Sequence, residues 1–453
     1  MADTIRRQAA RALQSILYEG AYSSLLIDRA LKAMPDGTPE RDRRFFTGLI
    51  YTTLEHLPTV DAVLDASSSV KTEKMKPWVA VNLRMALAQI LYMDRVPASA
   101  AVNAAVELVR DSACSRLSGF VNGVLRGCGR SGYAFERPDP AAEPLRALSL
   151  EYDMPEWIVS LWRDAYGEEV CRALLARSRG EKPLSVRANT LKITPDELFA
   201  RLKEELGEDR VRRSELLPEV FYPAYEASFS DWSLYREGLL YAQDESSVLA
   251  AMALRAEPGQ KVLDLCAAPG GKTAVLAQMM NDQGRIDSRD LHPQRVRLIE
   301  EMTERLGIGC VRASAADGTD PSSVSEGAYD AVLLDAPCSG LGVLRSKPDI
   351  KYRRSASDAL ALSAVQEKLL ETAARALRPG GRLVYSTCSL HPEENEKRIE
   401  AFLAAHPNFS LVDLEKELPS IGECDKISHK YMIIFPVEQG RDGFFVAALQ
   451  KSL

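Results

Sequence analysis

Two cysteines of the sequence each follow an apolar run that is typical of a buried strand. Cys338 lies in Leu334-Asp335-Ala336-Pro337-Cys338-Ser339-Gly340-Leu341-Gly342, and Cys388 lies in Tyr385-Ser386-Thr387-Cys388-Ser389. Ligands of an open α/β sheet bind at the rim where its strands end, so we expect both thiols at that rim. A redox pair is one alternative, but no C-x-x-C pattern supports it. A buried cysteine is usually inert filler, and this is the role we expect for four others: Cys114, Cys128, Cys171 and Cys310.

A second set of functional residues lies in the glycine-bearing stretch Asp264-Leu265-Cys266-Ala267-Ala268-Pro269-Gly270-Gly271-Lys272-Thr273. The apolar run before it is typical of a strand, and residues 273–283 have the spacing of an amphipathic helix. A strand, such a turn and a helix form the first βα unit of a doubly wound sheet, where nucleotides bind. Small residues let the backbone approach a ligand, and the helix N-terminus offers free N–H groups. We therefore expect cofactor contacts from seven residues: Cys266, Ala267, Ala268, Pro269, Gly270, Gly271 and Lys272.

Three interpretations of this turn compete. A phosphate-binding P-loop requires G-x-x-x-x-G-K-[ST], but here the first glycine position holds Cys266 and Pro269 lacks an N–H group. A turn without any ligand is the second interpretation, because glycine turns are common. The third is a loop around S-adenosylmethionine, which carries no phosphate and needs close packing more than N–H donors. The motifs that follow along the chain favour the third interpretation.

Two acidic residues continue the pattern after the glycine turn. Asp290 comes about twenty residues later, at the expected end of the second strand, where an acid suits the two hydroxyls of a ribose. Asp317 lies where the third strand should end and would accept a hydrogen bond from an adenine amino group. Either acid alone is weak support, because loop aspartates are usually solvated. As an ordered series they indicate a nucleoside site.

Composition places the chain among globular proteins of two or three domains. It has 453 residues, 46% of them hydrophobic, and a formal net charge of −7. Residues 1–130 hold 17 lysines and arginines against 13 acids, a balance of +4, whereas the remainder carries −11. The N-terminal third is thus the basic part, which is compatible with nucleic-acid binding or with ordinary variation between domains.

Several classes of protein are disfavoured by composition. No apolar run approaches the length of a membrane span, and residues 1–20 lack the apolar region of a secretory signal. The eight cysteines do not form a disulfide framework, and the five histidines show no ligand spacing. We therefore expect a cytoplasmic protein with no membrane segment and no metal site.

The elements that position these residues divide the chain into three predicted domains. Helical periodicity without strand-like alternation predicts an all-α bundle over residues 1–140, and the Pro- and Gly-bearing stretch 131–144 predicts a linker. Residues 145–240 are expected to form a small α/β subdomain. Strands and helices alternate over residues 241–453, which predicts a mostly parallel, Rossmann-like sheet covered on both faces. Its expected strands are Lys261–Leu265, Ala328–Leu334, Gly381–Ser386 and Gly443–Leu449.

The N-terminal third resembles the NusB-like RNA-binding domain. The matching strings are Asp42-Arg43-Arg44-Phe45, Leu83-Arg84-Met85-Ala86, Val102-Asn103-Ala104-Ala105-Val106-Glu107 and Phe120-Val121-Asn122-Gly123-Val124-Leu125-Arg126. RNA phosphates are contacted mainly by basic side chains, although any one arginine is more often a solvated surface residue. The candidates are Arg6, Arg7, Arg11, Arg43, Arg44 and Arg126.

The region from Gln243 to Leu449 resembles RNA cytosine-5 methyltransferases, and the whole chain resembles their bacterial RsmB (Sun/Fmu) branch. One departure is Asp287-Ser288-Arg289-Asp290, where that family usually places small apolar residues before the acid, so Asp287 is not expected to bind the ribose. The supporting strings are Cys266–Lys272, Asp335–Ser339, Lys347-Pro348-Asp349-Ile350-Lys351, Ser386–Ser389, Pro392-Glu393-Glu394-Asn395-Glu396 and Asp442-Gly443-Phe444-Phe445-Val446-Ala447.

The resemblance implies methyl transfer from S-adenosylmethionine to C5 of a cytosine in 16S ribosomal RNA, with cytosine 967 as the family's target. It assigns Cys388 as the nucleophile that adds to C6 and Cys338 as the second thiol, which helps to resolve the adduct. It places Asp335 against the base and within the cofactor site. Lys272 would lower the pKa of a nearby thiol or serve in packing. The target base must leave its stack to reach such a pocket.

Two other functions stay open at this point. One is the same chemistry on another RNA such as transfer RNA, which the NusB-like domain disfavours. The other is a non-catalytic RNA-binding assembly factor, which the intact cysteines, acid and loop disfavour. The expected partner is small-subunit ribosomal RNA, and the expected state is a monomer without metal.

Overall fold

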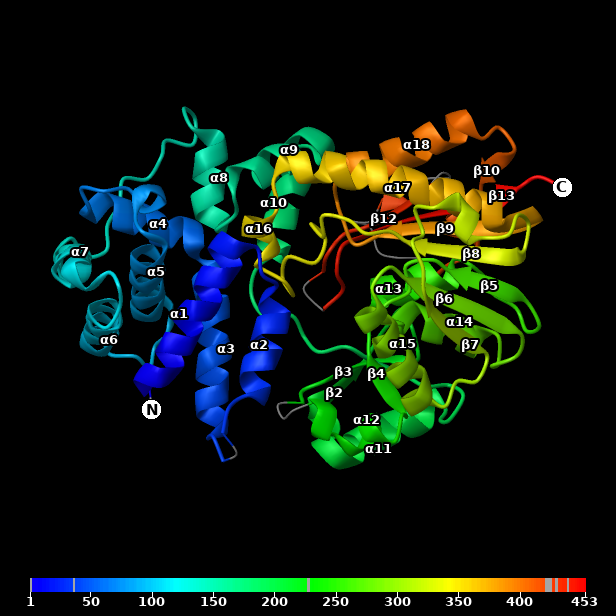
Figure 1. The fold of residues 1–453 in the computed structure, drawn as a ribbon, viewed down its shortest axis with the longest axis horizontal. Coiled ribbons are helices and arrows are strands. Elements are labelled where there is room, and N and C mark those ends of the chain that lie inside the picture. The colour runs from blue at the N-terminus through cyan, green and yellow to red at the C-terminus, as the bar shows by residue number, and fades with distance from the viewer. Residues whose placement is uncertain (1, 36, 226–228, 420–425, 428–430, 438–439) are drawn as a thin grey trace. The chain divides into compact units, whose positions relative to one another are not determined.

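The computed structural model describes residues 2–35, 37–225, 229–419, 426–427, 431–437 and 440–453. They form two compact units (Figure 1). The first consists of Met1–Arg179 with Ser346–Ser355, and the second of Gly180–Arg345 with Ala356–Leu453. The division into two compact units does not test the three predicted domain ranges, 1–140, 145–240 and 241–453, which stay a prediction.

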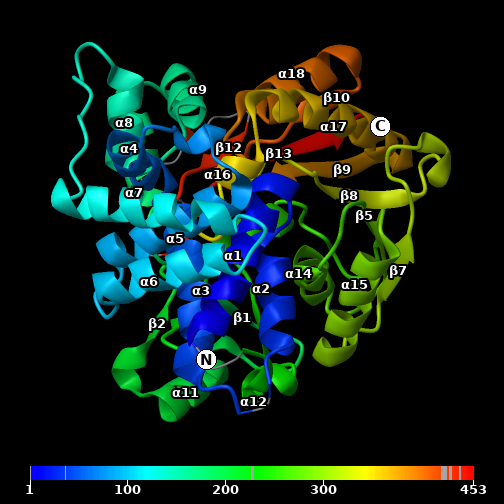
Figure 2. The ribbon, with the colours of Figure 1, turned by 60° about the vertical axis from the view of Figure 1, so that its left-hand side comes forward.

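The described part of the first unit contains helices and no strand, as was predicted for residues 1–140. Helix α5 is its centre, because its residues from Val79 to Gln89 are buried and it packs against α1, α3, α4, α6 and α7. Figure 2 shows α1, α3 and α5 side by side. The helices of this unit are α1 Ala2–Glu19, α2 Ser23–Lys32, α3 Glu40–Glu55, α4 Leu57–Ser67, α5 Pro77–Tyr92, α6 Ala98–Arg110, α7 Ser118–Arg130, α8 Pro144–Tyr152, α9 Glu156–Tyr166, α10 Glu168–Arg177 and α16 Ile350–Arg353.

Most of the arginines that were predicted to contact phosphate are engaged within this unit. Arg6 is only 7% exposed and its Nε donates to Gln89 Oε1 at 2.8 Å. A phosphate contact by Arg6 was therefore a wrong prediction, since helical spacing placed it on an inward face. Three further candidates have protein partners: Arg7 with Asp111, Arg43 with the carbonyl of Leu31, and Arg44 with Glu40. Arg11 and Arg126 are exposed.

Residues 346–355 belong to the helical unit although they follow the Cys338 stretch in sequence. Asp349 accepts a hydrogen bond from Ser23 Oγ at 2.5 Å and pairs with Arg353 Nη1 at 2.9 Å. Lys351 is 1% exposed, and its Nζ donates to the backbone oxygen of Asp153 at 3.2 Å. The string Lys347–Lys351, which supported the family resemblance, thus has a structural role, because Asp349 and Lys351 are buried in the helical unit.

The second unit contains a small antiparallel sheet of order β2-β3-β1-β4. Helix α11, Pro195–Leu206, covers it and begins with a capping box between Thr194 and Glu197, as the Thr-Pro start predicted. This confirms a small α/β element ahead of the large sheet. The strands are β1 Val186–Ala188, β2 Val211–Arg213, β3 Val220–Pro223 and β4 Leu240–Ala242, and the short helix α12 spans Ser233–Arg236.

The large sheet has the order β11-β12-β13-β9-β8-β5-β6-β7, with β10 paired to β13. The five strands from β9 to β7 are parallel, and β13 runs antiparallel to β9. All four strands expected from sequence are present, whereas β10, β11 and β12 were not predicted. The strands are β5 Lys261–Asp264, β6 Arg285–Asp290, β7 Val311–Ala315, β8 Tyr329–Asp335, β9 Leu377–Thr387, β10 Phe409–Leu411, β11 Lys426–Ile427, β12 Met432–Ile434 and β13 Phe444–Lys451.

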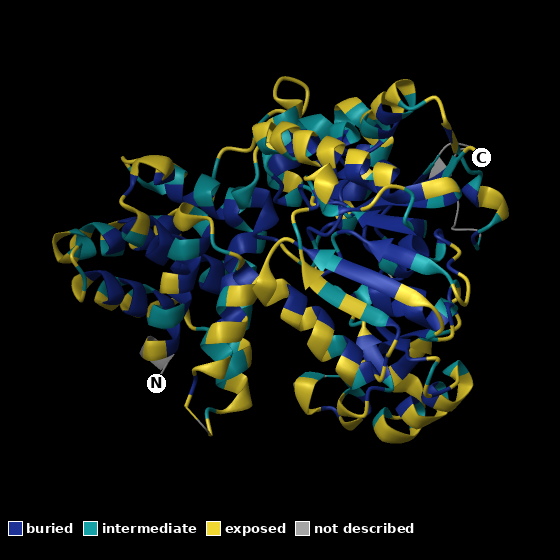
Figure 3. Cartoon of the chain, turned by 45° about the vertical axis from the view of Figure 1, so that its right-hand side comes forward, coloured by how far each residue is buried: buried dark blue, intermediate teal, exposed yellow. Residues whose placement is uncertain are grey.

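Helices cover both faces of this sheet, as expected for a Rossmann-like domain. Figure 1 shows α17 and α18 over one face and α13, α14 and α15 over the other. The strands between them are largely buried (Figure 3). None of the described helices is long and apolar enough to cross a membrane. The helices are α13 Glu245–Met252, α14 Gly271–Met279, α15 Pro293–Leu306, α17 Ala356–Ala376 and α18 Glu396–Ala405.

The buried ammonium group of Lys351 predicts a pH dependence of stability. Burial lowers the pKa of Lys351 from 10.5 to about 8. Between these values the unfolded chain binds more protons than the folded one, so the free energy of unfolding rises with pH across that window. Below it both states are protonated, and the cost of burying the charge is present in full. We expect Lys351→Met to have a higher thermal midpoint than the wild type at neutral pH. The variant should also lack the wild-type increase of the midpoint with pH, and calorimetry over this range would measure both.

The control is Lys347→Met, which changes an exposed lysine of the same segment. Its midpoint should follow the wild-type pH profile. A Lys351→Met protein with the wild-type profile would show that the charge of Lys351 does not limit stability.

Candidate active site

The strand order fixes where the candidate residues meet. The chain passes from β5 outward to β6 and β7 and then returns to β8 on the other side of β5. Such a reversal opens a crevice at the carboxyl ends of the two central strands. In register, Asp264 pairs with Leu333 of β8, and Asp335 pairs with Ser386 of β9. The loops that follow β5, β8 and β9 therefore leave the sheet side by side.

The two cysteines lie together at this rim. Cys338 Sγ and Cys388 Sγ are 3.4 Å apart, and both side chains are half-buried. The hydrogen bond with Cys388 and burial raise the pKa of Cys338 well above its usual range, and the charges of Glu394 and Asp335 add to this rise. The two thiols are therefore in hydrogen-bond contact, and Cys338 holds its proton more tightly than a free thiol does.

Asp335 lies beside the thiols at the end of β8 and is paired with a cation. Lys272 Nζ donates to Asp335 Oδ2 at 2.7 Å, and Ser386 Oγ donates to Asp335 Oδ1 at 2.8 Å. The ammonium group of Lys272 also lies 5.0 Å from the ring centroid of Phe444. Lys272 is thus engaged with a carboxylate and an aromatic face, which favours a role in holding Asp335 over a direct contact with a thiol.

The glycine-bearing loop forms a tight turn between β5 and α14. Gly270 has a φ of +107°, a backbone conformation that other residues rarely adopt, and an added Cβ atom would also displace the flexible end of Met302. Arg289 O accepts from the N–H of Ala267 at 2.8 Å, which ties the loop to β6. Burial raises the pKa of the Cys266 thiol, so this side chain is neutral. Ala267, Ala268 and Gly271 complete the close-packed turn, and Pro269 is exposed at its tip.

The two predicted nucleoside acids differ in their surroundings. Asp290 ends β6 and is 3% exposed, accepting from the N–H of His292 at 3.2 Å and lying 3.4 Å from Arg295 Nη1. Asp317 is exposed two residues beyond β7, and Thr319 donates two hydrogen bonds to its Oδ1 that hold its pKa below the usual value. The carboxylate of Asp287 is already occupied, because it pairs with Arg285 and accepts a hydrogen bond from the hydroxyl of Tyr329.

Two buried polar groups beside the loop lack partners among the residues that the structure describes. Gln243 is 7% exposed with neither amide atom bonded, and its Nε2 lies 3.4 Å from the position that a Cβ on Gly271 would take. Asp264 accepts from Thr273 Oγ1 through one oxygen, while its other oxygen is unpartnered. Burial raises the pKa of Asp264 to about 7. Unpaired buried polar atoms are costly, so this turn fits a polar bound molecule such as the amino-acid end of S-adenosylmethionine.

Sequence reasoning assigned no role to Gln243, Asp264 or Glu394, all of which contact this rim. Glu394 O accepts from Tyr385 OH at 2.6 Å, and its carboxylate accepts from the residues that follow both cysteines. Glu394 lies inside a string that carried the family resemblance, Asp264 lies two residues before another, and Gln243 is the first residue of the region that resembles the family.

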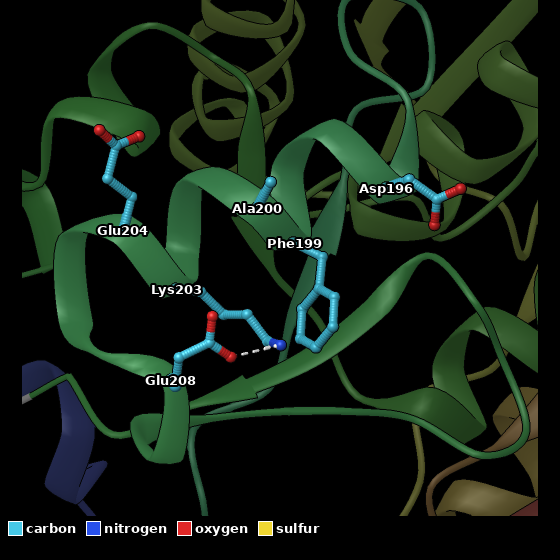
Figure 4. A pocket seen from close by; sticks show the side chains of 6 residues that line it. All are labelled: Asp196, Phe199, Ala200, Lys203, Glu204 and Glu208. Atoms are coloured by element: carbon cyan, nitrogen blue, oxygen red, sulfur yellow. Dashed lines mark ion pairs between the residues drawn. The ribbon is translucent and has the colours of Figure 1, made fainter.

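A hollow elsewhere on the second unit has no part in this site. It lies along α11, and Figure 4 shows Lys203 and Glu208 paired at its edge, with a separation of 2.7 Å. In the described part of the chain, no group of three or more His, Cys, Asp or Glu side chains is placed to hold a metal ion. The lining residues of the hollow are Asp196, Phe199, Ala200, Lys203, Glu204 and Glu208.

Three family models match the chain. The model described as 16S rRNA methyltransferase RsmB/F matches residues 251–450, and the NusB family model matches residues 3–130. The ferredoxin-like domain model of RsmF/B-like methyltransferases matches residues 154–220.

Individual relatives match over nearly the full length. Probable ribosomal RNA small subunit methyltransferase B of Bacillus subtilis is 35% identical over 99% of both chains. Ribosomal RNA small subunit methyltransferase B of Xanthomonas campestris is 31% identical over 99% of this chain and 97% of that protein. The crystal structure of PH0851 superposes with a TM-score of 0.82 at 29% identity, covering 98% of this chain and 99% of its own.

Close backbone packing beneath Cys388 generates a prediction for Gly342. The N–H of Gly342 donates to Cys388 O at 2.9 Å, and a Cβ on Gly342 would lie 2.1 Å from Gly443 O and 2.9 Å from Cys388 O. An alanine therefore forces the backbone of Cys388 to move. We expect Gly342→Ala to lower stability by about 1–3 kcal/mol, the scale of overpacking, and to change the alkylation rate of Cys388, measured by mass spectrometry.

The matched control is Gly123→Ala on α7, where an added Cβ meets nothing within 4 Å. It should leave both the stability and the reactivity of Cys388 close to wild type. Equal behaviour of the two variants would show that the contact with Cys388 O tolerates a side chain.

Proposed function

The chain belongs to the RsmB/F family of 16S rRNA methyltransferases, and from this premise we propose that it methylates C5 of a cytosine in small-subunit ribosomal RNA. The family uses S-adenosylmethionine, so the enzyme is a methyltransferase that depends on this cofactor. We propose cytosine 967, the family's target, as the nucleotide. The observation that carries the proposal is the contact of Cys338 with Cys388 beside the Lys272–Asp335 pair.

The reaction needs a nucleophile because C5 of cytosine is too weak to attack a methyl sulfonium directly. Cys388, as a thiolate, adds to C6, and the electron pair of the C5–C6 double bond moves into the ring to give an enamine. S-adenosylmethionine supplies the methyl group that C5 then takes. Solvent water takes the C5 proton, its bonding electrons restore the C5–C6 double bond, and the Sγ–C6 bond breaks to return the thiolate of Cys388, to which the S–H group of Cys338 can donate a hydrogen bond. We assign Cys338 to this release.

Asp335 acts at N3, where the electron pair of the ring arrives when the thiolate adds: a proton shared between N3 and the carboxylate leaves the adduct neutral. Its oxygens already accept from Lys272 and Ser386, but each carboxylate oxygen can accept more than one hydrogen bond. The side chain keeps 31% of its surface exposed, so N3 and the exocyclic amine of a base can reach it. Lys272 holds this carboxylate in place and screens its charge from the incoming ring.

We propose cofactor contacts from residues that follow the strands at the rim, taken in the order of the chain. The loop from Cys266 to Lys272 packs against the cofactor, and Asp290 binds the ribose hydroxyls. Asp317 accepts from the adenine amino group. Gln243, which sequence reasoning did not include, can donate to a carboxylate and accept from an ammonium group through one amide.

The helical unit supplies the proposed RNA contacts. Arg11 and Arg126 remain the exposed candidates for phosphate binding. A NusB family match over residues 3–130 supports ribosomal over transfer RNA as the substrate. We propose a cytoplasmic monomer, in which the target base is turned out of its stack to enter the site.

Substituting each thiol separately tests the mechanism. Cys388→Ala should abolish both methylation of unmodified small-subunit RNA and any covalent protein–RNA band. Cys338→Ala should still form the adduct but release it slowly, so a band that survives denaturing electrophoresis should accumulate. Cys310→Ala, a buried cysteine away from the rim, is the control and should methylate normally. A stable adduct with Cys388→Ala and none with Cys338→Ala would reverse the assignment.

Two ligands separate the proposed ends of the cofactor site. 5′-Methylthioadenosine lacks the amino-acid part of S-adenosylmethionine but keeps the nucleoside. Gln243→Leu should weaken S-adenosylmethionine by about tenfold, the scale of a lost hydrogen bond to a charged group, and leave 5′-methylthioadenosine unchanged. Asp290→Ala should weaken both ligands. Calorimetry measures each affinity.

The control for Gln243 is Gln283→Leu, which alters an exposed glutamine beyond the far end of α14. It should bind both ligands as the wild type does. If Gln243→Leu weakens the two ligands equally, Gln243 does not contact the amino-acid end.

A further inference from the structure

Glu394 joins the two cysteine loops through buried hydrogen bonds. It is fully buried within the 3-10 turn Pro392–Glu394, and its carboxylate accepts from Ser339 Oγ and from Ser389 Oγ, each at 2.5 Å. The N–H of Ser339 donates to Glu394 Oε1 at 2.7 Å. Gln366 of α17 donates to the same oxygen at 3.3 Å and also to Pro337 O at 3.0 Å. One carboxylate thus binds the residues that directly follow Cys338 and Cys388.

The two serines also contact each other, which makes the link a closed triangle. Ser339 Oγ and Ser389 Oγ are 2.8 Å apart, and both side chains are buried. Asn395 anchors the second loop independently, because its Nδ2 donates to Ser389 O at 2.8 Å. Hydrogen bonds to a charged acceptor are about twice as strong as neutral ones. The carboxylate therefore makes charge-assisted hydrogen bonds to both loops, the one after β8 and the one after β9.

We propose that Glu394 is a positioning residue that sets the spacing of the two thiols. Consecutive Cα atoms are about 3.8 Å apart across a trans peptide, so fixing Ser339 and Ser389 fixes the backbone of each preceding cysteine. The 3.4 Å separation of the sulfurs then depends on the carboxylate of Glu394. This inference rests on the proposed function, in which the two thiols act on one cytosine in turn.

The charge of Glu394 has a second consequence at Cys338. Burial raises the pKa of Glu394, but its hydrogen bonds from Ser339 and Ser389 favour the ionised form. That negative charge is one of the causes that hold the pKa of Cys338 above its usual range. Replacing the carboxylate by an amide should therefore lower the pH at which Cys338 loses its proton.

The thiol spacing is measurable without RNA or cofactor. Dibromobimane fluoresces only when both of its ends have reacted with thiols that lie close together. The wild-type full chain gives the rate for the pair. The variant Cys338→Ser, which has only one of the two thiols, gives the background signal. We expect Glu394→Gln to slow cross-linking by about tenfold or more, the effect of losing one charge-assisted hydrogen bond. Glu393→Gln is the matched control, because that neighbouring glutamate pairs with Lys397 instead, and it should cross-link at the wild-type rate.

Two further readouts separate positioning from general loss of structure. In a Cys388→Ser background, Glu394→Gln should shift the alkylation profile of Cys338 to lower pH; because exposure of the thiol would do the same, the shift supports the role of Glu394 only together with the next readout. S-adenosylmethionine affinity should stay at the wild-type value as a check on the fold. If Glu394→Gln does not fold, Ser389→Ala removes two sides of the triangle, the contacts of Ser389 with Glu394 and with Ser339, and should also slow cross-linking.

The outcomes are distinct from those that test the proposed function. Unchanged cross-linking and an unchanged alkylation profile in Glu394→Gln, or equal slowing in Glu393→Gln, would overturn the positioning role. Absence of methyl transfer in the wild type, with the cross-linking results as expected, would overturn the proposed function while leaving the role of Glu394 in spacing the thiols intact.

Discussion

The parallel pairing of β8 with β5 on one side and β9 on the other governs the placement of every group at the rim. Asp264, Asp335 and Ser386 stand at the ends of these three strands because the register aligns them. A shift by one residue would turn each side chain to the opposite face of the sheet. The glycine turn, Asp335 and the two thiols therefore share one crevice only in this register. The helices on both faces protect it by burying the strands.

The rim combines several polar groups whose burial opposes folding. Asp264 keeps one unpartnered oxygen among the described residues and Gln243 an unpartnered amide, while Glu394 is buried but well supplied with donors. A fully satisfied buried network specifies one arrangement, whereas an unsatisfied group costs free energy until something binds it. The two kinds of group lie in different places: the satisfied carboxylate lies behind the cysteines, and the unsatisfied atoms face the glycine turn. The carboxylate of Glu394 is thus well supplied with donors, although Gln366 Oε1 beside it lacks a partner among the described residues.

Sequence patterns predicted what depends on neighbours along the chain. Strands β5, β8, β9 and β13 were expected because each is a continuous apolar run, and Asp290 ends β6 where the interval after the glycine turn predicted. Residues whose partners are distant in the sequence were missed. Glu394 is an example, because Ser339 lies 55 residues away and no local pattern connects the two. Arg6 was misassigned to RNA because charge suggested exposure, whereas Gln89, 83 residues away, binds it inside the helical unit. The short strands β10, β11 and β12 carry too few residues for their period to stand out.

The contact between the two sulfurs also bears on which cysteine attacks. When two thiols touch, loss of the first proton makes loss of the second harder, so the pair favours one thiol and one thiolate. The hydrogen bond with Cys388 and burial raise the pKa of Cys338, and the charges of Glu394 and Asp335 add to the rise, so this sulfur holds its proton tightly. A protonated Cys338 does not compete for C6 of the base, and its S–H can donate to the thiolate of Cys388 at 3.4 Å. A tightly held proton on Cys338 agrees with the proposal of Cys388 as the nucleophile, an assignment that comes from the family resemblance.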